Sequence, residues 1–381
     1  MKHRARLWIG GCVALLLAAC DPPQGEAIDD GNPDLDDLTI VPRGGGDPLC
    51  TVRLLTANLE HVTWCNAMER NGMVEQAVCD IDDGKSPPPE PARLLAWLQV
   101  LYLQTLEGPG PTIFNLQESS VLMPRTGNVD WVRVLHLMLG ASAVDPAYGD
   151  YASWYQPING GVAGNNWGNA IVTNLDVNAY EEWNLDQAWT AADGSPVGEA
   201  CNGEVSRAAH AAHVRVDGVD LWSVNVHLEF CKPEDQGGFE VNLCNFDNLL
   251  LRLDSLPTDE VVVVSGDFNI GQDARTNDSD ACNGPVHPNR FMTMLGGFQD
   301  RQFMLLESTG VDHLFFRDPS FETSDVRTRV FDALYDPNEP GESGPPEDIL
   351  DMSDHKFIET EVDVGGAGMS RAFLPMYVVL N

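Results

Sequence analysis

Short apolar runs alternate with longer segments of helical periodicity along most of this chain. Runs rich in β-branched residues are typical of buried strands, whereas amphipathic segments of several turns are typical of helices. The pattern predicts strands over residues 51–58, 112–117, 168–173, 208–216, 219–227, 260–265, 311–316 and 357–362. It predicts helices over residues 91–106, 129–139 and 239–256.

The order of these elements indicates the class of fold. Asp217-Gly218 separates two strand runs and is a hairpin signal, whereas other strands are joined through helices. This mixture predicts a mixed sheet, or two packed sheets with outer helices. No repeat and no break in composition occur within residues 49–364, so one domain is expected there, with an exposed acidic loop at 336–348 and a tail at 365–381.

The first twenty residues have the pattern of a secretory signal. Basic residues precede a short apolar run over 7–17, which is too short for a permanent membrane helix. The segment ends Leu17-Ala18-Ala19-Cys20, which resembles a bacterial lipobox and implies lipidation at Cys20. The alternative is an ordinary signal peptide that contains a cysteine. We expect an exported lipoprotein, on the periplasmic side or the cell surface, with an acidic flexible tether over residues 21–48.

Charge narrows the classes of partner. The chain has 22 Lys+Arg and 58 Asp+Glu, a formal net charge of −36. Such a surface does not favour tight binding of long nucleic acids by phosphate neutralisation. An anionic substrate would approach with the help of metal ions or a local basic group. No protein partner is evident, and a monomer is expected.

Cysteine usage suggests disulfides, because an exported chain folds in an oxidising compartment. Nine cysteines occur in the chain, and seven of them follow the signal. Proximity in sequence suggests the pairs Cys65–Cys79 and Cys231–Cys244, and an odd number leaves at least one cysteine free or paired elsewhere. No C-x-x-C spacing is present, so a zinc site is not expected.

Polar residues gather where the predicted strands end. They include carboxylates, carboxamides and imidazoles, while the motifs G-x-S-x-G, G-x-x-x-x-G-K and G-x-G-x-x-G are absent. Carboxylate and amide oxygens suit Mg²⁺, Mn²⁺ or Ca²⁺, and imidazoles beside them can act as acid and base near neutral pH. The strand-end residues are Asn58, Glu118, His227, Asp267, Asn269, Asp312, Asp354 and His355.

The order of these motifs resembles the endonuclease/exonuclease/phosphatase superfamily, which includes deoxyribonuclease I and the bacterial sphingomyelinases. The matching segments span residues 51–362 and read TANLEH, IFNLQES, WGNAIVTN, VNVHLEF, VVVVSGDFN, STGVDHLFF and MSDHKFI. The resemblance implies an α/β fold, a four-layer α/β/β/α sandwich of two packed mixed sheets with outer helices. It also implies catalysis with Mg²⁺ or Mn²⁺.

The resemblance assigns metal-binding and phosphate-binding roles. Glu118 is the principal carboxylate ligand of the metal, and Asn58 and Asp354 are further ligands or support them. Arg207, in EVSRAAH, and Asn169 are candidate phosphate-binding residues.

The resemblance also assigns catalytic roles. Asp267 and Asn269 position the scissile phosphate and the attacking water. His355 is the catalytic imidazole, held in its tautomer by Asp312, and His227 is a second imidazole and candidate general acid. An alternative gives the activation of water to Asp267.

The function implied is hydrolysis of phosphodiester bonds, with a deoxyribonuclease I-like nuclease favoured. Two alternatives are a sphingomyelinase-like or phosphoinositide-type lipid phosphoesterase and a catalytically idle binding module. Trp183 and Trp189 could form an aromatic hairpin for membrane insertion, although packing is the favoured interpretation. Acidic clusters at 80–83 and 273–280 could hold structural Ca²⁺, although solvated loops are favoured.

Overall fold

Two six-stranded sheets form the body of the molecule. The computed structural model describes residues 50–59, 110–121, 130–142, 151–157, 167–191, 193–201, 207–229, 238–271, 290–319, 323–331, 334–335, 350–351 and 355–364. The first sheet has the strand order β13 (Thr323–Phe331), β16 (Phe357–Val364), β1 (Cys50–Asn58), β2 (Thr112–Ser120), β4 (Trp167–Thr173), β3 (Ala152–Pro157). The second has the order β11 (Met304–Thr309), β12 (Asp312–Arg317), β10 (Val261–Asp267), β9 (Val219–His227), β8 (Ala208–Val216), β5 (Val177–Asn184).

Both sheets are mixed. In the first sheet β1 and β2 run parallel, and in the second β9 and β10 run parallel, while the remaining neighbours are antiparallel. Two short pairs complete the strands: β6 (Trp189–Thr190) with β7 (Pro196–Val197), and β14 (Leu334–Tyr335) with β15 (Leu350–Asp351). The described helices are α4 (Trp131–Ser142), α5 (Gly238–Leu253) and α6 (Arg290–Gln299).

Alternation along the strands builds two apolar layers. Val263 of β10 faces the first sheet, in a core with Leu54 of β1 and Val214 of β8. Its neighbour Val264 faces the opposite way, in a core shared with Phe246 of α5 and Phe298 of α6. All seven residues of β10 are buried, as expected for a central strand covered on both faces.

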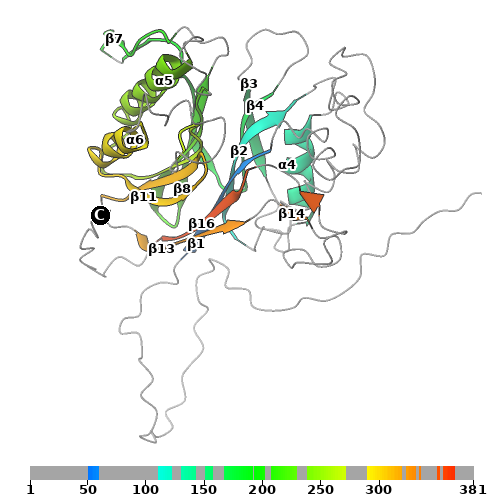
Figure 1. Cartoon of the computed structure of the whole chain (residues 1–381). Coiled ribbons are helices and arrows are strands. Elements are labelled where there is room, and N and C mark those ends of the chain that lie inside the picture. The colour runs from blue at the N-terminus through cyan, green and yellow to red at the C-terminus, as the bar shows by residue number, and fades with distance from the viewer. Residues whose placement is uncertain are drawn as a thin grey trace, which may run out of the picture.

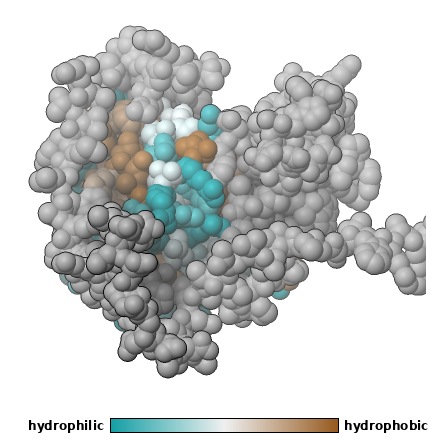
Figure 2. All heavy atoms as spheres, turned by 90° about the horizontal axis from the view of Figure 1, so that it is seen from below, coloured by the Kyte–Doolittle hydropathy of each residue, from teal (hydrophilic) through white to brown (hydrophobic). Residues whose placement is uncertain are grey.

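Figure 1 shows the resulting four layers: α5 and α6 lie outside the second sheet, and α4 lies outside the first. This arrangement confirms the predicted α/β/β/α sandwich. The lower face of Figure 1, near β13, β16 and β1, is viewed in Figure 2, where a hydrophilic strip lies beside an apolar area. Ion pairs cross these strands, for example between Arg53 and Glu359 and between Arg327 and Glu361.

Most predicted elements within the described residues are confirmed. The hairpin strands β8 and β9 have the predicted bounds, with Asp217-Gly218 at the turn. The strands β3, β5, β11 and β13 and the helix α6 were not predicted. The helix expected over 91–106 and the loop at 336–348 lie outside the described residues. Within the described part, no helix has the length and apolar character needed to cross a membrane.

The disulfide pattern differs from the expectation. Cys244 of α5 is bonded to Cys201, so the predicted pair Cys231–Cys244 is wrong. The fold brings the two Cα atoms to 5.5 Å across 43 residues of sequence, a contact that proximity along the chain cannot indicate. The predicted pair Cys65–Cys79 lies outside the described residues.

Candidate active site

Strand register assembles the candidate active site at one end of the second sheet. Asp267, the last residue of β10, is paired with His227 on β9 and with Asp312 on β12. All three residues are buried. Asn58, at the end of β1, reaches across from the first sheet and donates a hydrogen bond from Nδ2 to Asp267 Oδ2 at 3.1 Å. The site therefore lies between the two sheets.

A glycine in the GDFN segment makes the close pairing possible. Gly266 precedes Asp267 and has a φ of 142°, which residues with a Cβ rarely adopt. A Cβ at Gly266 would lie 2.1 Å from the carbonyl oxygen of Val226 on β9. The glycine thus lets β10 approach β9 closely beside the buried carboxylate.

Hydrogen-bond partners define the tautomer of His355. Its Nδ1 lies 2.8 Å from Asp312 Oδ2, and its Nε2 lies 3.4 Å from Asn58 Nδ2. A carboxylate accepts and an amide nitrogen donates, so the neutral ring carries its proton on Nδ1 and has a lone pair on Nε2. The hydrogen bond to Asp312 therefore fixes the orientation of the His355 ring.

His227 lies on the other side of Asp267. Its Nε2 is 3.6 Å from Asp267 Oδ2 and 3.9 Å from Glu118 Oε1. Arg207, just before β8, brings Nη1 to 3.2 Å from the same nitrogen. The ring of Trp167 lies 5.7 Å from the His227 ring and 5.4 Å from the Arg207 guanidinium. His227 thus stands between a cation and two carboxylates.

Two site residues adopt left-handed backbone conformations. Glu118 has a φ of 53° at an irregularity in the β2–β4 pairing, and Asn269 has a φ of 52°. Such conformations are uncommon outside glycine and persist where surrounding structure fixes them. Asn269 is fixed by its N–H, which donates to Asp267 Oδ1 at 2.8 Å, and by its Nδ2, which donates to the Leu228 carbonyl at 2.9 Å.

Burial raises the pKa of Asp267 from 3.8 to about 7. The carboxylates of Asp312 and Glu118 raise this pKa further, while His355 and the Asn269 N–H lower it. Removal from water is therefore the main reason that the ionised form is disfavoured, and the neighbouring carboxylates add repulsion. A cation bound here would relieve that repulsion.

The residues present fit a divalent cation. One donor atom each from Asp267, Asp312 and His355 lies within 4.8 Å of the others. Because Asp312 and His355 are hydrogen-bonded to each other, Asp267 is the candidate ligand within this group. Glu118 adds a partly exposed carboxylate with 17% of its side chain accessible, and Asn58 adds an amide. Oxygen-rich donor sets of this kind suit Mg²⁺ or Mn²⁺.

Other predicted site residues have different positions. Asn169 is fully buried, and its Nδ2 donates to the Ala208 carbonyl at 3.0 Å, so it links β4 of the first sheet to β8 of the second. Asp354 and Cys20 lie outside the described residues.

A buried polar layer leading to the site was not predicted. Asn115 of β2 donates from Nδ2 to the hydroxyls of Ser223 and Ser265, both at 2.9 Å. Gln117 donates from Nε2 to Asn225 Oδ1 at 2.6 Å. These residues share the inward face of their strands with the site residues. Because every second residue of a strand faces the same side, their spacing of two from the site residues was the signal that could have indicated them. Trp167 and Glu229, the latter two residues after His227, were also missed.

A separate polar cluster lies toward the opposite ends of β8, β9 and β10. His213 Nε2 lies 3.3 Å from Asp220 Oδ1 and 3.8 Å from Glu260 Oε2. Trp222 stacks on the His213 ring at 4.8 Å and donates to Glu260 Oε2 at 2.6 Å. This cluster joins neighbouring strands and shares no residue with the candidate active site.

Comparison with known proteins returns structural matches alone. No family model matches the sequence, and no curated protein matches it. An endonuclease/exonuclease/phosphatase from Beutenbergia cavernae is 15% identical, with 84% of this chain and 72% of that chain covered and a TM-score of 0.47. An endonuclease/exonuclease/phosphatase family protein from Bacteroides thetaiotaomicron is 14% identical, with 82% and 95% covered and a TM-score of 0.46. Truncated TDP2 from Caenorhabditis elegans is 13% identical, with 82% and 98% covered and a TM-score of 0.43.

Proposed function

We propose that the chain is a divalent-metal-dependent phosphoesterase of the endonuclease/exonuclease/phosphatase superfamily, and that it hydrolyses phosphodiester bonds as a deoxyribonuclease I-like nuclease. One observation carries the proposal. Asp267 is in register with His227 and Asp312, and Asn58 of the other sheet is hydrogen-bonded to it. Asp312 in turn holds His355. The proposed base His355, the proposed acid His227 and the cation-binding carboxylate of Asp267 therefore meet at one point.

His355 serves as the general base. Asp312 holds the proton of the neutral ring on Nδ1, so Nε2 is the atom that takes a proton from water. Asp312 also stabilises the imidazolium that forms. A positioned base of this kind contributes about 10²- to 10⁴-fold in rate.

His227 and Arg207 serve the leaving group and the phosphate. Without substrate, Arg207 Nη1 donates to His227 Nε2 at 3.2 Å, so this nitrogen is the acceptor; when a substrate phosphate takes over the Arg207 hydrogen bond, Nε2 is the atom that would carry a proton to the leaving oxygen, close to the carboxylates of Glu118 and Asp267. Arg207, whose Nη1 lies 3.2 Å from that nitrogen, donates to a nonbridging phosphate oxygen.

The metal would be held by Glu118, Asp267 and Asn58, together with Asp354 from the sequence motif. When bound, such an ion neutralises charge that develops on the transferred phosphoryl group. Asn58 and the Asn269 N–H hold the Asp267 carboxylate in place by hydrogen bonds to its two oxygens.

The described residues bear on the choice of substrate. Trp183 is 1% exposed in the core under α5, and Trp189 packs against the Arg252 guanidinium at 4.0 Å. These contacts support packing roles for both tryptophans, in place of the membrane-inserting hairpin that sphingomyelinases usually add. The acidic clusters at 80–83 and 273–280 lie outside the described residues.

A substrate panel tests the proposal. Purified protein is given plasmid DNA, RNA, sphingomyelin and a phosphoinositide, each with Mg²⁺ and with chelator. We expect hydrolysis of nucleic acid with Mg²⁺ and none with chelator. Hydrolysis of a lipid alone would replace the nuclease assignment with the lipid alternative, and hydrolysis that persists in chelator would contradict the metal requirement.

We also propose that the chain is exported and anchored through acyl chains on Cys20. The basic residues, the short apolar run and the lipobox-like ending support this proposal. Cys20→Ser should release the protein from the membrane fraction and prevent incorporation of labelled fatty acid. Unchanged labelling of that variant would contradict the anchor.

A further inference from the structure

The Arg207 guanidinium beside the candidate active site is held by the buried carboxylate of Glu229. Arg207 is 5% exposed, and Glu229 is 4% exposed. Arg207 Nη2 lies 3.1 Å from Glu229 Oε1, and Arg207 Nε lies 3.4 Å from Oε2. This two-pronged contact fixes the plane of the guanidinium and leaves Nη1 directed at His227.

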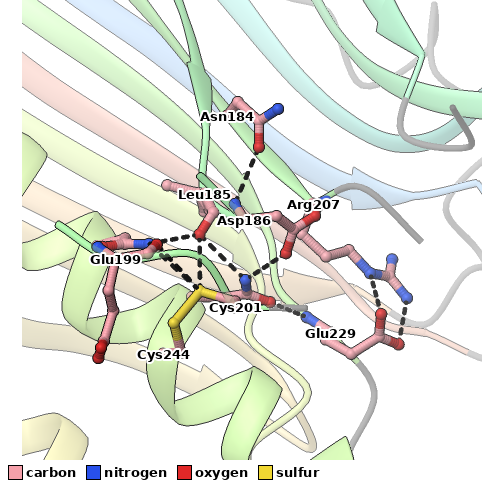
Figure 3. The surroundings of a disulfide bond; sticks show 10 residues. Asn184, Leu185, Asp186, Glu199, Cys201, Arg207, Glu229 and Cys244 are labelled. Carbon is pink, nitrogen blue, oxygen red and sulfur yellow. Dashed lines mark hydrogen bonds and ion pairs between the residues drawn. A yellow bond between two sulfur atoms is a disulfide. The ribbon is translucent and has the colours of Figure 1, made fainter. Parts of the chain in front are cut away.

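Both members of this pair are fastened to one face of α5. The Glu229 N–H donates to Asn245 Oδ1 at 3.3 Å, and Asn242 Nδ2 donates to the Glu229 carbonyl at 2.6 Å. The Arg207 N–H donates to Asp186 Oδ2, and Asn245 Nδ2 donates to Asp186 Oδ1 at 2.7 Å. Figure 3 shows Asp186, Arg207 and Glu229 in this arrangement.

The disulfide strengthens the same attachment. Cys244 lies on α5 between the two asparagines and is bonded to Cys201. The Cys201 N–H donates to the Asp186 carbonyl at 2.9 Å, and Asn248 Nδ2 donates to the Leu185 carbonyl at 2.7 Å. Figure 3 shows this cross-link beside Leu185 and Asp186. The disulfide therefore ties Cys201 to the helix whose asparagines hold Asp186 and Glu229.

We propose that Glu229 is a positioning residue, which holds the Arg207 guanidinium beside His227 so that it can receive a substrate phosphate. This inference rests on the proposed function. Without the Glu229 carboxylate, Arg207 keeps its charge but loses the partner that sets its direction, and the cation turns toward other acceptors. Glu229 then acts on phosphate through Arg207 and not by contact of its own.

Binding of inorganic phosphate in the presence of Mg²⁺, measured by calorimetry on the full chain, tests the inference. Glu229→Gln keeps the shape of the side chain and removes its charge. We expect phosphate affinity and kcat/KM to fall about 10- to 100-fold, as is typical when an outer partner of a functional group is lost. Glu229→Asp, which shortens the side chain and keeps the charge, should give an intermediate loss and serves as the test if Glu229→Gln does not fold.

Asp254→Asn is the matched control. Asp254 makes a similar two-pronged contact with Arg301, with both N–O distances 2.7 Å, at the end of α5 and with no contact to the site. Its loss should leave phosphate affinity unchanged.

A double-mutant cycle separates positioning from general destabilisation. In an Arg207→Met background, Glu229→Gln should cause no further loss of phosphate affinity. A folded Glu229→Gln protein with wild-type affinity, or a loss that adds fully to that of Arg207→Met, would overturn the inference, and so would wild-type protein that does not bind phosphate. Wild-type protein that binds phosphate but hydrolyses no phosphodiester contradicts only the proposed function.

Discussion

The ionisation of Asp267 should make the metal-free protein less stable as pH rises. Burial, with the carboxylates of Asp312 and Glu118, raises its pKa from 3.8 to about 7. The native state therefore binds this proton more tightly than the unfolded chain does. The stability that this bound proton contributes is fully present below the pKa that Asp267 has in the unfolded chain, and it is lost as pH rises through the pKa that Asp267 has in the folded protein.

The magnitude follows from the two pKa values. A shift of this size corresponds to about 4 kcal/mol over the whole titration, and about 2.5 kcal/mol of it falls between about pH 5 and pH 8. This is an upper value, because a buried site relaxes when it becomes charged. In Asp267→Asn the titrating group is gone, so this part of the pH dependence should be absent. Bound Mg²⁺ favours the ionised carboxylate and should reduce the loss in the wild type.

Urea unfolding in chelator, at several pH values between about 5 and 8, measures the effect in wild type and Asp267→Asn. We expect the free energy of unfolding of the wild type to fall by about 2 kcal/mol more than that of the variant over this range. Subtracting the variant removes the contribution of histidines that titrate in both proteins. If the unfolding free energies of the two proteins changed with pH in parallel, the electrostatic reasoning would be refuted. A steeper fall in Asp267→Asn would mean that the effect of Asp267 has the opposite sign.

Three further predictions concern single residues. Asp312→Asn removes the acceptor that orients His355 Nδ1 and should lower kcat by about 10³-fold or more with little change in fold, measured by steady-state kinetics and circular dichroism. Gly266→Ala places a Cβ 2.1 Å from a carbonyl of β9 and should lower unfolding stability by about 3 kcal/mol or more in urea titrations, with wild-type stability contradicting the close approach. Cys201→Ser opens a cross-link across 43 residues and should cost up to about 4 kcal/mol, seen as a lower melting temperature than that of wild type.

The central strands could be predicted because they are buried on both faces. The run of valines in β10 and the apolar faces of β8 and β9 indicate strands without ambiguity. β13 was missed because it is an edge strand with an exposed face, where Arg327 and Arg329 pair with carboxylates of β16. β5 was missed for a similar reason, since it lies at the other edge of its sheet and its exposed and partly buried residues do not alternate regularly.

The candidate site could be predicted in composition but only partly in geometry. Asn58 and Asp267 are the last residues of β1 and β10, and Asp312 is the first residue of β12, and these three strand ends meet in the fold. The Arg207–Glu229 pair depends on how β8, β9 and α5 pack, and no local pattern records that packing. The Cys231–Cys244 pair was predicted wrongly for the same reason, because the packing of α5 brings Cys201 to Cys244 and no local pattern records that packing.

Hydrolysis of plasmid DNA in Mg²⁺ by wild type and His355→Ala, compared side by side, is the decisive test of the proposed chemistry. We expect the wild type to cleave, and the variant, with its fold intact, to be slower by several orders of magnitude, on the order of 10³-fold. Cleavage by His355→Ala at close to the wild-type rate would contradict the role assigned to the Asp312–His355 pair. A wild-type protein that cleaves neither DNA nor any other phosphodiester in Mg²⁺ would contradict the proposed function itself.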